Sequence, residues 1–286
     1  MKTILLALRD AARFLSRGGA FTWLGFGLLC AIVLMAVFAP LIAPYDPLEQ
    51  DIVNRLLPPS PEFWLGTDSY GRDVLSRLIY GARVSLVVGI VAIAIAMVIG
   101  TAMGILAGYI GGRFDAFVMA IVDIMLSFPS LLLGMLVAAV LGASLENLII
   151  AIAITEIAPF ARLARAPTLV LKEQDFIQAT RAMGCSHSRI MGVHIVPNIM
   201  SEILVMASLW MATAIRTEAS LSFIGLGVKP PTPTWGGMIR EGFENILEAW
   251  WLAVFPSIFV FVTVLALNLL GDGLRDATDP KLRQRT

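Results

Sequence analysis

Three stretches of the chain contain no charged residue and are each long enough to cross a lipid bilayer as a helix. They are residues 21–42, 84–112 and 250–270. A bilayer core of about 30 Å requires about 20 apolar residues of helix. Hydrophobic residues make up 58% of the sequence and charged residues 15%, against about 45–50% and about 25% in soluble globular proteins. The sequence therefore predicts an integral membrane protein.

Three further apolar segments bring the predicted number of membrane spans to six. They are residues 116–141, residues 144–161 and a segment that begins near Ile203. An even number of spans places both termini on the same side of the membrane. The predicted fold is therefore an all-α integral membrane protein with six transmembrane helices.

Basic residues are unevenly divided between the two sides of this topology. Four lie in the N-terminal tail, one after the second span, five in residues 162–198 and four in the C-terminal tail, whereas the other side holds six. Because Lys and Arg accumulate in cytoplasmic loops, both termini and residues 162–198 are expected in the cytoplasm. Residues 44–81 and 225–248 are expected outside.

The charge balance and the motifs exclude several classes of protein. Basic and acidic residues number 21 each, so the chain has no excess positive charge with which to bind nucleic acid. No lysine follows a glycine, and a P-loop for ATP is therefore absent. His187 and His194 have no cysteine or carboxylate cluster at ligand spacing. The sequence predicts no catalytic residue, no metal site and no cofactor in this chain.

Four ionisable residues at membrane depth are candidates for function. They are Asp123, Glu156, Arg216 and Glu218. Because a charge that faces lipid is costly, each is expected to face a cavity, a partner charge or an interface. Asp123 and Glu156 could also reach toward the cytoplasmic headgroups. Structural pairing within the helix bundle and direct contact with a substrate are both open, but Arg216 and Glu218 cannot face each other on a helix.

A stripe of glycines follows the second predicted span, at Gly100, Gly104 and Gly108. The absence of side chains along one stripe lets a neighbouring backbone approach closely. The stripe predicts tight helix packing, either within the chain or against a second subunit.

A short helix is predicted just before the second span, over residues 72–80. Four apolar residues share one face of it, namely Val74, Leu75, Leu78 and Ile79. As an interfacial helix it would support an external gate or dock a partner. The alternative is a surface connector that rests on the bilayer.

Residues 173–198 form the most informative polar segment. The first part predicts a helix, and the residues that share one face of it are Phe176, Ile177, Thr180 and Met183. Gly184 is expected to end this helix with a positive φ, Ser186 to cap a short second helix, and Pro197 to mark the entry to the fifth span. A short helix held between two turns is suited to transmit a partner's movement into the spans.

Three parts of this segment resemble the cytoplasmic EAA loop of binding-protein-dependent ABC importer permeases. The pattern of that loop is E-A-A, three residues, G and, further on, I-x-L-P. The matching parts are Gln178-Ala179-Thr180, Gly184 and Ile195-Val196-Pro197, with Gln for Glu, Thr for the second Ala and Val for Leu. The resemblance implies a loop that couples the chain to an ATPase through Gln178, Ala179, Thr180, Gly184, Ser186, His187, Ile195 and Pro197.

Further stretches are similar to the "C" permease subunit of the dipeptide/oligopeptide/nickel branch of this family. They are residues 66–77, residues 218–228 with 230–236 close behind, and residues 268–276. The resemblance implies a type I ABC importer permease fold. It also implies three parts: a tail, first transmembrane helix and periplasmic segment (1–80), an ABC type-1 transmembrane permease domain (81–275) and a cytoplasmic tail (276–286).

The resemblance implies a multi-pass subunit of an ATP-driven importer in the bacterial inner membrane. The expected partners are a homologous second permease, two ATPase subunits that bind ATP and Mg, an external solute-binding protein and membrane lipid. The chain itself would not be an enzyme. It would move short peptides by alternating access, with nickel or metal chelates and other small solutes as alternatives. A secondary transporter is the rival class, and uptake without ATP would favour it.

Overall fold

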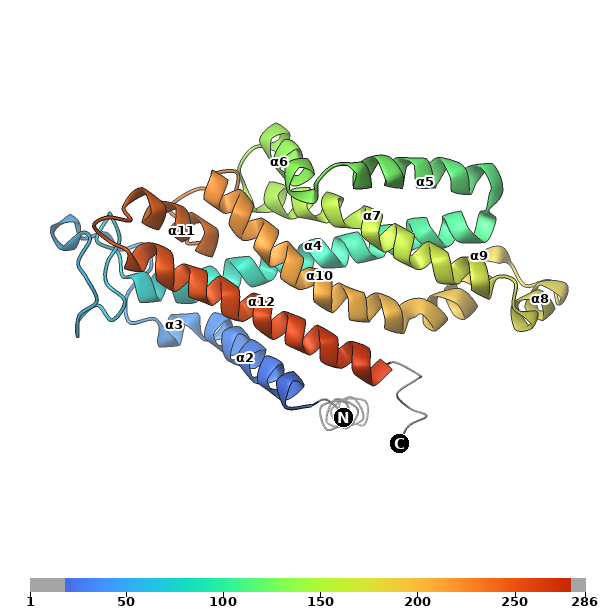
Figure 1. The fold of residues 1–286 in the computed structure, drawn as a ribbon, viewed down its shortest axis with the longest axis horizontal. Coiled ribbons are helices and arrows are strands. Elements are labelled where there is room, and N and C mark those ends of the chain that lie inside the picture. Colours follow the sequence, from blue (N-terminus) through green and yellow to red (C-terminus); the bar gives the residue numbers. More distant parts are fainter. Residues whose placement is uncertain (1–18, 279–286) are drawn as a thin grey trace.

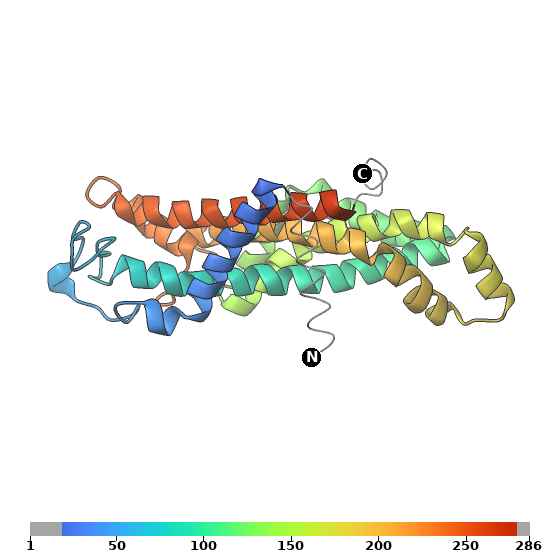
Figure 2. The same ribbon diagram turned by 90° about the horizontal axis from the view of Figure 1, so that it is seen from below.

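The computed structural model describes residues 19–278. Four long helices run side by side (Figure 1): α4 (Val74–Ile110), α7 (Leu145–Leu171), α10 (Val196–Ile224) and α12 (Trp251–Thr278). A fifth, α2 (Ala20–Val37), crosses them obliquely (Figure 2). Within the described residues, β structure is limited to an isolated bridge between Thr67 and Asp73. The predicted all-α fold is confirmed.

Shorter elements lie at the ends and along one side of this bundle. They are α3 (Ala39–Ile42), η1 (Ile52–Asn54), α5 (Gly112–Ser127), α6 (Ser130–Leu141), α8 (Asp175–Ala182), α9 (His187–Arg189), η2 (Ile190–Ile195) and α11 (Trp235–Glu244). Residues 44–73 and α11 form one end of the molecule, and α8 and α9 form the other (Figure 1). The bias of Lys and Arg assigns the α8 end to the cytoplasm; the opposite end is called the outer end below.

The first and last residues of the described chain lie toward the same end of the helix bundle. The start of α2 packs against the last turns of α12, where a Cβ on Gly25 would lie 2.7 Å from Leu269 Cβ and one on Gly273 would overlap Thr22. This arrangement agrees with an even number of spans. The tails before residue 19 and after residue 278, predicted to be cytoplasmic, lie outside the described residues.

The third predicted span differs from the structure. Five described helices are long and apolar enough to cross a membrane, or six if α5 and α6 count as one span, and these two helices meet at 94°. The third predicted span, residues 116–141, is therefore formed by two helices at an angle rather than by one straight helix. Pro129 explains the break, because proline lacks a backbone N–H and disfavours a helical conformation at the preceding residue. Phe128 is accordingly extended, with φ −86° and ψ 137°.

The second span begins earlier than the sequence predicts. Helix α4 is continuous from Val74 to Ile110, so residues 72–80 are neither a separate interfacial helix nor a connector resting on the bilayer. Val74 and Leu78 are fully buried, and Trp235 on α11 donates a hydrogen bond from Nε1 to the carbonyl oxygen of Leu78 at 3.0 Å. The first turns of α4 are therefore core, packed beneath α11.

The helices that contain the fourth and fifth predicted spans are longer than those spans. Helix α7 continues ten residues beyond Ala161, and α10 begins at Val196 rather than near Ile203. The fourth predicted span ends just before the charges of Arg162 and Arg165. Both guanidinium groups are bound to carboxylates on α5, so the helix continues through them.

The glycine stripe of α4 packs against α7 within the same chain. A Cβ on Gly100 or Gly104 would overlap the carbonyl oxygen of Ile157 or Ala161, respectively, and a Cβ on Gly108 would lie 3.0 Å from the carbonyl oxygen of Arg165. Three successive turns of α4 thus touch the backbone of α7. These two helices form the closely packed centre of the molecule.

Candidate functional site

The cytoplasmic loop, residues 172–187, is built around a tight turn after α8. Helix α8 ends at Ala182, and Gly184 has φ +80°, a conformation that residues with a side chain rarely adopt. Ser186 then caps α9, its Oγ accepting a hydrogen bond from the Arg189 backbone N–H at 3.4 Å. The predicted helix, turn and cap are all present. Helix α9 passes through η2 directly into α10, so the loop joins the fifth span without a break.

The apolar side chains of the cytoplasmic loop are divided between the core and the surface. Of the four residues predicted to share one face, Ile177 and Thr180 are buried, whereas Phe176 is 44% and Met183 75% exposed. Val193 in η2 is 58% exposed. These exposed apolar side chains are accessible to a partner protein.

Two of the remaining residues of the predicted coupling set form hydrogen bonds within the loop. Gln178 donates from Nε2 to the carbonyl oxygen of Lys172 at 3.0 Å, and Thr180 donates to that of Phe176 at 2.7 Å. Ala179 and Pro197 are exposed, and Ile195 is buried.

Both ends of the cytoplasmic loop are hydrogen-bonded to the last turn of α4. Lys172 donates from Nζ to the carbonyl oxygen of Gly108 at 2.9 Å. Tyr109 Oη and His187 Nδ1 are hydrogen-bonded at 2.8 Å, and the guanidinium of Arg181 lies 5.6 Å from the centre of the Tyr109 ring. We therefore expect a displacement of the loop to move α4.

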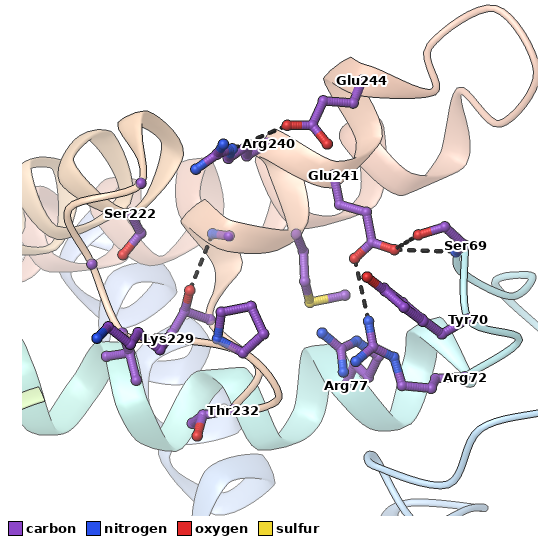
Figure 3. Close-up of a pocket in the computed structure, with 17 residues that line it drawn as sticks. Ser69, Tyr70, Arg72, Arg77, Ser222, Lys229, Thr232, Arg240, Glu241 and Glu244 are labelled. Atoms are coloured by element: carbon purple, nitrogen blue, oxygen red, sulfur yellow. Dashed lines mark hydrogen bonds and ion pairs between the residues drawn. The ribbon is translucent and has the colours of Figure 1, made fainter. Parts of the chain in front are cut away.

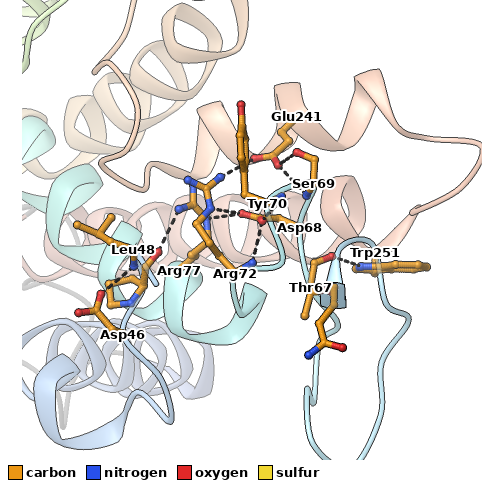
Figure 4. Close-up of polar contacts among 12 residues, drawn as sticks. Asp46, Leu48, Thr67, Asp68, Ser69, Tyr70, Arg72, Arg77, Glu241 and Trp251 are labelled. Carbon is orange, nitrogen blue, oxygen red and sulfur yellow. Dashed lines mark hydrogen bonds and ion pairs between the residues drawn. The ribbon is translucent and has the colours of Figure 1, made fainter. Parts of the chain in front are cut away.

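The outer end contains a buried charge cluster centred on Asp68 (Figure 4). Asp68 Oδ2 lies 2.6 Å from Arg72 Nε and 3.1 Å from Arg77 Nε. Asp68 Oδ1 accepts hydrogen bonds from the backbone N–H groups of Tyr70 and Arg72. Asp68 and both arginines are at most 6% exposed, so the carboxylate balances two guanidinium groups away from water.

The outer charge cluster extends to α11 through Glu241. Its Oε2 lies 3.5 Å from Arg72 Nη2, and its Oε1 accepts hydrogen bonds from the backbone N–H and the hydroxyl of Ser69. Beside these contacts lies a cavity of about 330 Å³, also lined by Lys229 and Arg240 (Figure 3). The outer charge cluster therefore holds together the outer segment (residues 44–73), α4 and α11. These contacts would have to break if this end of the molecule opened.

The outer charge cluster is not predicted by the sequence, which indicates only a short interfacial helix around Arg72 and no role for Glu241. Asp68 and Arg72 are four residues apart, a spacing that could have indicated a local ion pair, but the contact to Glu241 spans 169 residues and leaves no signal in a single sequence.

Two of the four polar residues predicted at membrane depth have clear partners. Asp123 pairs with Arg162 at 2.5 Å, and both side chains are more than half exposed. Glu218 is fully buried and accepts hydrogen bonds from Ser85 at 3.0 Å and Ser222 at 2.9 Å. Glu218 therefore joins α10 to α4, and, as the sequence predicts, it does not pair with Arg216.

Helix α4 connects the two ends of the molecule. It contains 37 residues, which corresponds to about 55 Å at 1.5 Å per residue. Its first turn is capped by Asp73 beside the outer charge cluster, and its last turn holds the cytoplasmic loop. We therefore expect α4 to relay movement between the two ends.

Tyr109→Phe is expected to lower the ratio of solute imported to ATP hydrolysed in the reconstituted transporter, by about tenfold or less. The substitution removes only the hydroxyl bound to His187, a contact worth about 0.5–1.5 kcal/mol. Tyr80→Phe is the matched control, because its hydroxyl has no hydrogen-bond partner among residues 19–278. Equal values for Tyr109→Phe and wild type would show that the hydrogen bond plays no part in coupling.

The fold is similar to those of known ABC transporter subunits. A chain of the MetNI methionine ABC transporter in inward-facing conformations matches with a TM-score of 0.58 and 19% identity, over 71% of this chain and 97% of that chain. A chain of an amino acid ABC transporter matches with a TM-score of 0.53 and 17% identity, over 69% and 92%. The architecture is thus that of a type I ABC importer permease.

Family models and relatives assign the chain more closely. Residues 100–284 match the family "binding-protein-dependent transport system inner membrane component", and residues 9–59 match the N-terminal transmembrane domain of oligopeptide transport permease C. The chain belongs to the family of binding-protein-dependent inner-membrane permeases. It is accordingly a multi-pass protein of the inner membrane.

Similar relatives are permease subunits from several bacteria. The dipeptide transport system permease protein DppC of Alkalihalophilus pseudofirmus is 44% identical, over 91% of this chain and 85% of the relative. The di/tripeptide permease DppC of Pseudomonas aeruginosa is 45% identical, over 94% and 90%. The glutathione permease GsiD of Pectobacterium atrosepticum is 45% identical, over 88% and 84%.

Proposed function

We propose that this chain is a permease subunit of an ATP-driven importer of short peptides. It acts with a homologous second permease, two ATPase subunits and an external solute-binding protein. The observation that carries the proposal is the cytoplasmic loop, which exposes Phe176 and Met183 and is fastened to α4 at both ends. The relatives named for dipeptides, di/tripeptides and glutathione support the substrate class.

In the proposed cycle, the ATPase subunits bind the exposed apolar side chains of the cytoplasmic loop. Their closure on ATP displaces the loop, and α4 moves with it because Lys172 and His187 tie the loop to the last turn of the helix. At the outer end, α4 carries Arg77, which shares Asp68 with Arg72. Movement of α4 would therefore act on the charge cluster that joins the outer segment to α11, and would open or close that end.

The substrate assignment is tested with the cognate solute-binding protein and the reconstituted transporter. Dialanine, trialanine or glutathione is expected to raise the melting temperature of the binding protein. The same peptide should accumulate in vesicles only when ATP, both permeases and both ATPases are present. Stabilisation by a nickel chelate alone would contradict the peptide assignment, and uptake by this chain without ATP would show a secondary transporter instead.

A further inference from the structure

Glu156 and Arg216 are the two predicted membrane-depth residues that the helix bundle does not satisfy. Glu156 on α7 is only 4% exposed, yet it accepts no hydrogen bond from any residue in the range 19–278. The opposite charge that acts on it is that of Arg216 on α10, and no ion pair joins these two described side chains. Arg216 is exposed at the surface of the single chain, and its one side-chain hydrogen bond within the described chain is a long one of 3.3 Å to Thr213.

The two residues lie at a similar depth in the outer half of the bundle. Glu156 is 11 residues from the outer end of α7 at Leu145, and Arg216 is 8 residues from the outer end of α10 at Ile224. At 1.5 Å per residue these separations are about 16 Å and about 12 Å. Their neighbours Thr155 and Thr217 both flank Gly134 of α6, within 4.0 Å of the position of a Cβ there.

An exposed guanidinium at this depth cannot face lipid without a large cost, since Arg at the centre of a membrane helix costs about 2.5 kcal/mol or more. Snorkelling to the outer surface would have to cover about 12 Å. The surface of α10 that carries Arg216 is therefore covered by water or by protein in the assembled transporter. In a family of transport permeases, a water-filled pathway beside the chain meets this requirement.

We propose that Arg216 and Glu156 line the translocation pathway and contact the charged termini of a short peptide. Arg216 binds the C-terminal carboxylate, and Glu156 binds the N-terminal ammonium. This inference rests on the proposed function, because it takes the substrate to be a peptide. A guanidinium can hold a carboxylate through two parallel hydrogen bonds, and an unpaired carboxylate of a buried residue is the complementary acceptor for an ammonium group.

The charge arrangement suits a zwitterion. Glu156 and Arg216 carry opposite charges and form no ion pair with each other or with another residue in the range 19–278, so a zwitterionic peptide would form two ion pairs and add no net charge to the site. Peptides of different side chains share the same two termini, so such a site accepts many sequences. It would leave the choice among them to the binding protein.

The test compares uptake of dialanine with uptake of its C-terminal amide by the complete reconstituted transporter. Arg216→Gln is expected to lower dialanine uptake by about tenfold or more, the loss of a hydrogen-bonded contact between charged groups. Uptake of the amide should change much less, so the acid-to-amide ratio falls. The binding protein is the same in every sample, so its own preference cancels in this comparison. Arg216→Lys should retain most of the preference, and Ser220→Ala, one turn away on α10, is the control.

Three results would overturn the assignment. Unchanged dialanine uptake by Arg216→Gln would show that Arg216 does not contact the peptide. An equal loss for acid and amide, with weaker co-purification of the second permease, would make Arg216 a structural residue at the subunit interface. Failure of the wild-type transporter to import either peptide, with peptide-loaded binding protein present, would refute the peptide function itself and would be visible before any variant is compared.

Discussion

Replacing Asp68 with asparagine is expected to lower the free energy of unfolding by about 3–5 kcal/mol, the usual cost of removing one partner from a buried ion pair. The single carboxylate balances Arg72 and Arg77, and all three side chains are at most 6% exposed. Without it, two guanidinium groups remain close together away from water. Glu241 is 3.5 Å from Arg72 and compensates only in part.

The measurement is thermal unfolding of the purified permease pair, followed by tryptophan fluorescence, because Trp235 and Trp251 are buried near the outer charge cluster. Glu244→Gln is the matched control. It breaks the ion pair between Arg240 and Glu244, whose side chains are 49% and 59% exposed, and such exposed pairs contribute about 0–1 kcal/mol. Similar melting temperatures for both variants would show that the Asp68 cluster does not hold the outer end together.

Much of the fold is predictable from the sequence, because membrane-spanning helices are encoded by local apolar stretches. The helical spans at residues 21–42 and 250–270 were found in this way. The boundaries failed where tertiary contacts compensate a charge. Arg162 and Arg165 are bound by carboxylates on α5, and α7 continues as a helix through both residues beyond the apolar stretch. The break at Pro129 carried a local signal that the hydropathy of residues 116–141 concealed.

In the candidate site, too, local features were predictable from the sequence and long-range contacts were not. Gly184 and Ser186 were predicted as a turn and a cap, since both roles depend on a few neighbouring residues, and both are present in the structure. The contact between Tyr109 and His187 joins positions 78 residues apart. A pairing at that separation depends on how α4 packs beside the loop, and a single sequence gives no information about it.

Gly184→Val is expected to uncouple ATP hydrolysis from transport. Gly184 has φ +80°, and a Cβ added there would meet no atom within 4 Å. The substitution therefore acts through the backbone alone, since a β-branched residue in this conformation carries strain of about 1–3 kcal/mol. Relief of that strain would tilt α8 and move Met183, while the spans, which lie outside the loop, should still insert. Gly184→Asn is the control, because asparagine tolerates a positive φ.

The central claim is that the cytoplasmic loop converts ATPase movement into transport, and one ratio tests it most directly. That ratio is peptide imported per ATP hydrolysed, measured for wild type, Gly184→Val and Gly184→Asn in the reconstituted transporter. We expect the value for Gly184→Val to fall at least about tenfold, as strain of about 1.4 kcal/mol or more would produce, with both permeases still present in the complex. Gly184→Asn should stay close to wild type. Normal coupling in Gly184→Val would contradict the account and place the ATPase contact elsewhere on the chain.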